Sequence, residues 1–120
     1  VYNYENTLSR VISENLSNIC YLIRGDIKDT IHDFVSSNEY KFNKSSLKIS
    51  ILYIDCNDYD TALLAMNLLK PYFSDGTIIA IDENKTGGET RALQEFCTNN
   101  NLKFYSSHFG GVISYFTIKN

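Results

Sequence analysis

The stretch Lys48–Glu83, KISILYIDCNDYDTALLAMNLLKPYFSDGTIIAIDE, decides the fold of this 120-residue chain. It contains two apolar runs, Ile49–Ile54 and Thr77–Ile81. Between them, apolar residues recur at helical spacing from about Asp60 to Tyr72. The pattern predicts a strand, a crossover helix and a second, parallel strand. Because the first run is apolar throughout, we expect that strand to be buried on both faces.

Both apolar runs end in acidic residues. Asp55 follows the first run, and Asp82 and Glu83 follow the second. The carboxyl ends of parallel strands form the ligand crevice of an open α/β sheet. Neighbouring carboxylates raise one another's pKa unless a cation or a base compensates their charge. We therefore expect a cation site or an acid–base site at this edge; the alternative is that each acid only caps the helix that follows it.

Further elements are predicted on both sides of this unit. They are a helix over Tyr4–Leu16, a buried strand at Ile19–Ile23, a helix capped by Asp29 or Thr30 that continues through Val35, a helix over Gly88–Thr98, and two strand-like runs, Leu102–Ser106 and Val112–Ile118. The short turn with two glycines between the last two runs predicts an antiparallel hairpin. Glu89 is expected to be a first-turn acid favoured by the helix dipole rather than a ligand.

Composition narrows the possible functions. The net charge is −3 and the pI is about 5.2, so the chain has no basic footprint for nucleic acid. No run approaches the roughly 18 apolar residues of a membrane span. Cys20, Cys56 and Cys97 form no CxxC pair, which favours reduced thiols and a cytoplasmic location. Cys56 adjoins Asp55 but has no nearby His in sequence to activate it, so we do not expect a nucleophile there.

Four short motifs carry a family resemblance. They are RGDIKDT at Arg24–Thr30, IDCNDYDT at Ile54–Thr61, GTIIAIDE at Gly76–Glu83 and GETRA at Gly88–Ala92. In this order they resemble the macrocin-type O-methyltransferases, which belong to the class I S-adenosylmethionine-dependent methyltransferases. The resemblance spans about residues 19–118. It implies a Rossmann-like α/β sheet, mostly parallel with a C-terminal antiparallel hairpin, in which residues 1–120 form a single partial domain without the first two strands.

The resemblance also implies an activity and a set of site residues. The parent protein would transfer a methyl group from S-adenosylmethionine to a hydroxyl of a small, sugar-like acceptor, with a divalent metal such as magnesium. By position, Asp55, Asp82 and Glu83 would be metal ligands, Asp55 and Asn57 would be catalytic, and Gly25, Asp26 and Tyr59 would contact the cofactor. An all-oxygen ligand set of this kind suits magnesium. The metal would lower the pKa of the acceptor hydroxyl and orient it.

Two departures from the family pattern keep other functions open. Asn57 stands where the family often has a second carboxylate, and an amide cannot act as a general base. The chain also has no glycine-rich cofactor loop, so we expect weak or absent cofactor binding by these 120 residues alone. One alternative is a non-catalytic α/β binding or assembly domain derived from a methyltransferase. Another is a magnesium-dependent phosphoryl-transfer domain, which would need a strand-end Lys that is absent here.

The strand predicted at Ile19–Ile23 raises the question of self-association. Without the first two strands of the fold, it must pair beside Ile49–Ile54, exchange with a partner chain or lie at an exposed edge. An exposed strand edge is a template for pairing with another chain. We therefore expect contacts between copies of the chain in a homo-oligomer.

Overall fold

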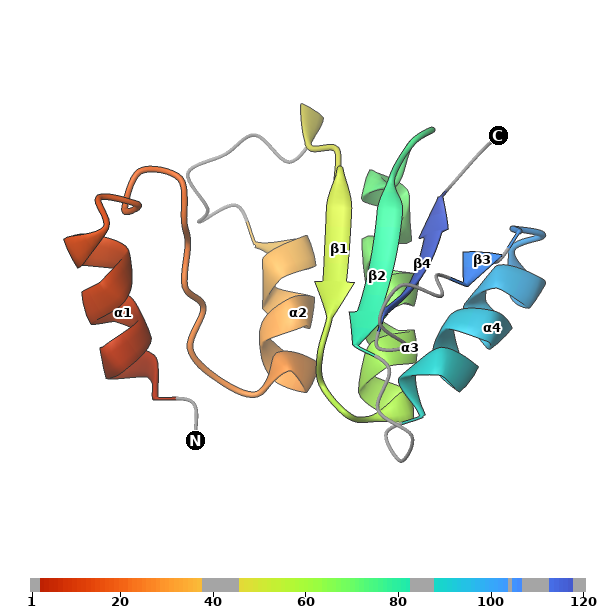
Figure 1. Ribbon diagram of the computed structural model, residues 1–120, viewed down its shortest axis with the longest axis horizontal. Helices are drawn as coiled ribbons and strands as arrows, with labels where there is room; N and C mark the ends of the chain where they lie inside the picture. Colours follow the sequence, from red (N-terminus) through yellow and green to blue (C-terminus); the bar gives the residue numbers. More distant parts are fainter. Residues whose placement is uncertain (1–2, 38–45, 83–87, 104, 107–112, 118–120) are drawn as a thin grey trace.

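A computed structural model describes residues 3–37, 46–82, 88–103, 105–106 and 113–117 of the chain (Figure 1). The helices and strands follow one another as α1 (Tyr4–Ser13), α2 (Ile27–Ser36), β1 (Ile51–Ile54), α3 (Tyr59–Leu69), the 3-10 helix η2 (Lys70–Tyr72), β2 (Ile78–Asp82), α4 (Glu89–Asn99), β3 (Tyr105–Ser106) and β4 (Ile113–Thr117). Among the described helices, none is long and apolar enough to cross a lipid bilayer.

The described strands form one sheet in the order β1-β2-β4-β3. Strands β1 and β2 are parallel, with Ile54 opposite Ile81, and they are joined through α3. Strand β4 is antiparallel to both β2 and β3. The α/β class, the parallel unit and the terminal antiparallel hairpin are therefore confirmed. The two-glycine turn predicted between the hairpin strands lies outside the described residues.

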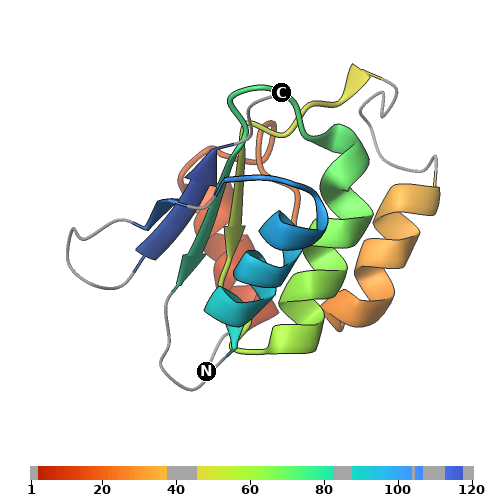
Figure 2. The same ribbon diagram turned by 90° about the vertical axis from the view of Figure 1, so that its right-hand side faces the viewer.

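Helices α2, α3 and α4 lie together on one face of the sheet, as Figure 2 shows. The core forms between this helical layer and the inner side chains of β1 and β2. Its fully buried or nearly buried members are Ile54, Ala62, Met66, Ile79, Ile81, Ala92, Leu93, Phe96 and Cys97. The ring of Phe96 meets that of Phe73 edge to face, with 6.1 Å between centroids. A second cluster under α2 joins Ile31 to Ala65 and Leu69 of α3.

The prediction that the first strand is buried on both faces is wrong. Ile54 is buried, but Ile51 is 65% exposed and Tyr53 is 53% exposed. Successive side chains of a strand point to opposite faces. In the described part of the chain, the helical layer covers only the face that carries Ile54, so the other face of β1 remains open to solvent.

The predicted buried strand at Ile19–Ile23 is also wrong. The described segment Cys20–Arg24 belongs to no helix or strand, and it runs between α1 and α2 in Figure 1. Ile19 is 76% exposed, Tyr21 is 51% exposed and Ile23 is 44% exposed. An apolar run becomes a strand only where another strand supplies ladder partners, and no described strand pairs with this segment.

Local capping explains where the helices begin. Helix α2 starts at Ile27, earlier than predicted, because Asp26 rather than Asp29 or Thr30 is its N-cap; Oδ1 of Asp26 accepts a hydrogen bond from the N–H of Lys28 at 2.9 Å. Helix α1 begins after Asn3, whose side chain caps it in the same way. It ends at Ser13 rather than Leu16.

Candidate functional site

The acidic ends of the two parallel strands lie side by side. Ile54 of β1 is paired in register with Ile81 of β2, so Asp55 and Asp82 are the next residues on neighbouring strands. Neighbouring strands are about 4.8 Å apart. Asp55 is exposed and Asp82 is half-buried. The third predicted ligand, Glu83, lies outside the described residues.

The loop after β1 connects this edge to two helices. Asn57 has a φ of 53°, in the left-handed region that Asn tolerates better than most residues. Asp58 is the N-cap of α3: its Oδ2 accepts hydrogen bonds from the N–H of Thr61, at 2.9 Å, and from the Thr61 hydroxyl. These bonds lower the pKa of Asp58 below its ordinary value. Asp58 is therefore used structurally, as a helix cap.

Glu89 is the deepest acid at this edge. It is the first residue of α4 and is 1% exposed. Its Oε1 accepts a hydrogen bond from the backbone N–H of Asn57, while Oε2 has no hydrogen-bond partner among the described residues. Burial raises the pKa of Glu89, and the charges of Asp55 and Asp82 raise it further, while the backbone N–H groups of Asn57 and Cys56 act in the opposite direction. The carboxyl group of Glu89 thus belongs to the same site as the two strand-end acids.

Glu89 lies at the start of a helix, as its sequence position predicts, but its burial was not predicted. The available signal was Gly88, which has a φ of 79° and provides no capping side chain. Because Gly88 has no Cβ, α4 can begin against Tyr59, where a Cβ would lie 2.9 Å from that of the tyrosine. Glu89, the next residue, is buried there. A glycine N-cap followed by an acid, just after an acidic strand end, therefore marked Glu89 as a site candidate.

The residues assigned to the cofactor each have a structural role. Asp26 caps α2, as described above. Gly25 has a φ of 134°, and a Cβ at this position would lie 2.8 Å from Cγ2 of Thr30. Gly25 is thus required by backbone conformation and packing alone. Their contact with a cofactor stays a prediction, and the described residues contain no glycine-rich loop that fits S-adenosylmethionine.

Tyr59 packs against α4. Its hydroxyl donates a hydrogen bond to Oε2 of Glu95, and this bond raises the pKa of Tyr59. The guanidinium of Arg91 lies 4.3 Å from the centroid of the Tyr59 ring, a cation–π contact. Tyr59 therefore joins the first turn of α3 to α4, beside the acidic edge, and its predicted role at the cofactor stays a prediction.

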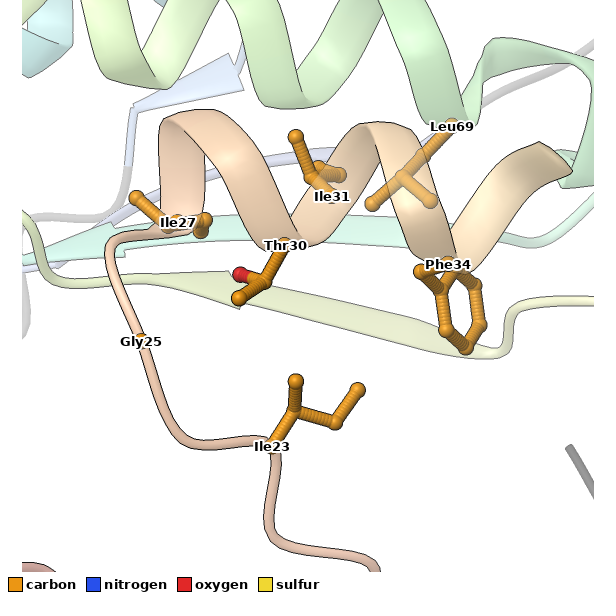
Figure 3. A pocket seen from close by; sticks show the side chains of 7 residues that line it. All are labelled: Ile23, Gly25, Ile27, Thr30, Ile31, Phe34 and Leu69. Atoms are coloured by element: carbon orange, nitrogen blue, oxygen red, sulfur yellow. The ribbon is translucent and has the colours of Figure 1, made fainter. Parts of the chain in front are cut away.

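Two cavities lie along α2. One, of about 300 Å³, reaches the acidic edge. Its lining residues are Ile27, Ile31, Leu52, Tyr53, Ile54, Asp55, Cys56, Thr61, Ala65 and Leu69. The other, of about 280 Å³, lies between α2 and the segment before it, with Ile23 of that segment facing Thr30 and Phe34 of α2 (Figure 3). Both are lined mainly by apolar side chains, and Asp55 is the charged residue in the lining of the larger one.

The described acids fit a hard cation only in part. Within the described residues, no group of three or more His, Cys, Asp or Glu side chains is placed to hold a metal ion. Asp55 and Asp82 supply oxygen donors from adjacent strands, and the unpartnered Oε2 of Glu89 is a buried acceptor beside them. Magnesium prefers oxygen donors and keeps several waters, so two protein carboxylates with an acceptor nearby match its chemistry.

Comparisons with known proteins identify the fold. No protein-family model matches the chain, and no curated protein sequence matches it. Two solved structures of CalS11, a TDP-rhamnose 3'-O-methyltransferase of calicheamicin biosynthesis, superpose with TM-scores of 0.72 and 0.73 at 19% and 18% identity, covering 98% and 100% of this chain. The O-methyltransferase NovP superposes with a TM-score of 0.69 at 14% identity over 98% of this chain.

These similarities define the class of fold, a Rossmann-like methyltransferase sheet. The chain spans about half the length of these structures: 52% and 49% of the two CalS11 chains and 46% of NovP. The methyltransferase fold expected from the sequence motifs is thus supported. At these identities the likeness concerns the fold alone and does not single out the macrocin-type family.

Proposed function

We propose that the protein is part of an S-adenosylmethionine-dependent O-methyltransferase that acts on a hydroxyl of a small, sugar-like acceptor with the help of a divalent cation. The observation that carries the proposal is the superposition of nearly the whole chain on sugar O-methyltransferases, combined with carboxylates at the ends of both parallel strands. The three free cysteines are consistent with a cytoplasmic protein.

The proposed cation site uses Asp55 and Asp82, with Glu83 as the third ligand. When bound, the cation would supply Lewis acidity towards the acceptor hydroxyl. Asp55, an exposed residue that lines the 300 Å³ cavity, would help to hold the acceptor there. Asn57 would contribute to the site through its amide, as it has no carboxylate to remove a proton.

The first test concerns the cofactor. Calorimetry of the 120-residue chain with S-adenosylmethionine and magnesium should give weak or no binding, because no described loop brings backbone amides to the cofactor. Micromolar affinity would show that S-adenosylmethionine binds without a glycine-rich loop and that this expectation is wrong. The longest gene product that contains these residues should bind S-adenosylmethionine if the enzymatic proposal is right.

The second test concerns methyl transfer. The gene product and its N57D variant would be assayed with labelled S-adenosylmethionine and a panel of sugar nucleotides that includes TDP-rhamnose. Transfer by either form supports the proposal, and a gain in N57D would mean that the missing base limits the rate. A lack of transfer by both forms, together with no binding of S-adenosylmethionine, would favour the alternative, a non-catalytic assembly domain, for which Asn57 is the supporting observation.

A further inference from the structure

The buried carboxyl group of Glu89 needs an explanation that the fold alone does not provide. A buried carboxyl without hydrogen bonds on both oxygens is costly, and native proteins rarely leave one so. Glu89 is 1% exposed, and its Oε2 has no partner among the described residues. A helix acid that only favoured the dipole could remain in solvent. Its burial at the strand ends therefore indicates that a bound group, absent from the structure, occupies the free oxygen.

The two oxygens of Glu89 have separate environments. Oε1 is occupied by the backbone N–H of Asn57, in the loop that carries Asp55. The free oxygen belongs to the same carboxyl group, on which the charges of Asp55 and Asp82 both act. These two acids follow directly on adjacent strands. The carboxyl group of Glu89 is thus within electrostatic range of both strand-end acids, and one of its oxygens has no hydrogen-bond partner among the described residues.

This inference rests on the cation site of the proposed function. We infer that Glu89 is a positioning residue for that site: Oε1 holds the loop that carries Asp55, and Oε2 accepts a hydrogen bond from a water bound to the cation. Direct ligation of the cation by Glu89 is not part of the inference. A hydrated magnesium ion retains waters that need acceptors of this kind.

The main test measures binding of Mn²⁺ alone to the 120-residue chain, by electron paramagnetic resonance of the free ion. In E89Q the side chain can still accept the Asn57 N–H, but it places an amide N–H₂ group where the free oxygen was. We expect the affinity to fall by about 10- to 100-fold, the usual effect of losing an outer-shell partner. The matched control is E95Q, which removes a carboxylate of α4 that bonds to Tyr59 instead; its Mn²⁺ affinity should be unchanged.

The outcomes separate this inference from the proposed function. If the wild-type chain binds Mn²⁺ and E89Q binds it equally well, Glu89 only holds Asn57 and the inference is overturned, while the cation site stands. If the wild-type chain binds no Mn²⁺, both fail. A second measurement needs no variant: in a ¹³C NMR titration with Mg²⁺, the side-chain carboxyl carbon of Glu89 should shift with the same midpoint as those of Asp55 and Asp82. If the chemical shift of Glu89 changes no more than that of Glu95 during the titration, the inference is also overturned.

Discussion

Gly88 lies against Tyr59 so closely that a Cβ on the glycine would be 2.9 Å from the Cβ of the tyrosine. The contact joins the residue that caps α4 to the first residue of α3. It sets the entry of α4 beside the loop after β1 and thereby the position of Glu89. Helices α3 and α4, which precede and follow β2 in the chain, can therefore approach each other closely because Gly88 has no Cβ.

This contact predicts the effect of Gly88→Ala. The variant should lose about 1–3 kcal/mol of unfolding free energy, because the φ of 79° is strained for any residue with a Cβ and the added methyl collides with Tyr59. Urea denaturation followed by circular dichroism measures the loss. The control is Gly76→Ala, at a φ of 90° with no atom within 4 Å of the new Cβ, which carries only the backbone cost. Equal losses in the two variants would contradict the role of the Tyr59 contact.

Asp58 predicts a pH-dependent contribution to stability. Its pKa is lowered in the folded state by hydrogen bonds from Thr61, below the ordinary value of 3.8. Stability gained from this group is present above pH 3.8 and is lost as the pH falls through the folded-state pKa. D58A should therefore unfold at a lower urea concentration than the wild type at pH 7. The difference between the two urea midpoints should become smaller below about pH 4. A difference between D58A and the wild type that stays constant from pH 7 to pH 3 would rule out the ionised cap.

The cysteines should differ in reactivity. Burial raises the pKa of Cys97 to about 11, and the residue is 2% exposed. Only about one part in a thousand of Cys97 is thiolate at pH 8, and the thiolate is the nucleophile. Iodoacetamide at pH 8 should therefore label the half-buried Cys20 first and Cys97 only after denaturation. Mass spectrometry of tryptic peptides measures this, and native labelling of Cys97 at the rate of Cys20 would contradict the buried assignment.

The open face of β1 predicts self-association of the 120-residue chain. Ile51 is 65% exposed on a strand that pairs with a described strand on one side only. Apolar edges of this kind attract further strands. Light scattering coupled to size exclusion should show a mass that rises with concentration, and I51K should reduce the rise. I12K, which alters an equally apolar, 58% exposed position on α1, is the control; a constant monomer mass at all concentrations would end this expectation.

The local sequence pattern was sufficient to predict the central strand, helix and strand. The strand, helix and strand between Ile49 and Ile81 were predicted within a few residues, because apolar periodicity and the acidic strand ends lie within the unit itself. Cap positions were less certain. Asp26, Asp29 and Thr30 all have side chains suited to an N-cap, and only the backbone geometry shows that Asp26 takes that place. The hairpin was predictable because its two glycines lie between two apolar runs.

The sequence by itself determined the parallel unit and the placement of Asp55 and Asp82 at adjacent strand ends, since both follow from residues close together in the chain. Only the tertiary structure decided that Glu89 is the buried acid of that edge, through a hydrogen bond to Asn57 from 32 positions away. It also decided that the apolar run at Ile19–Ile23 is exposed. Burial and strand pairing depend on which elements, distant in the sequence, pack against one another. No local sequence pattern contains that information.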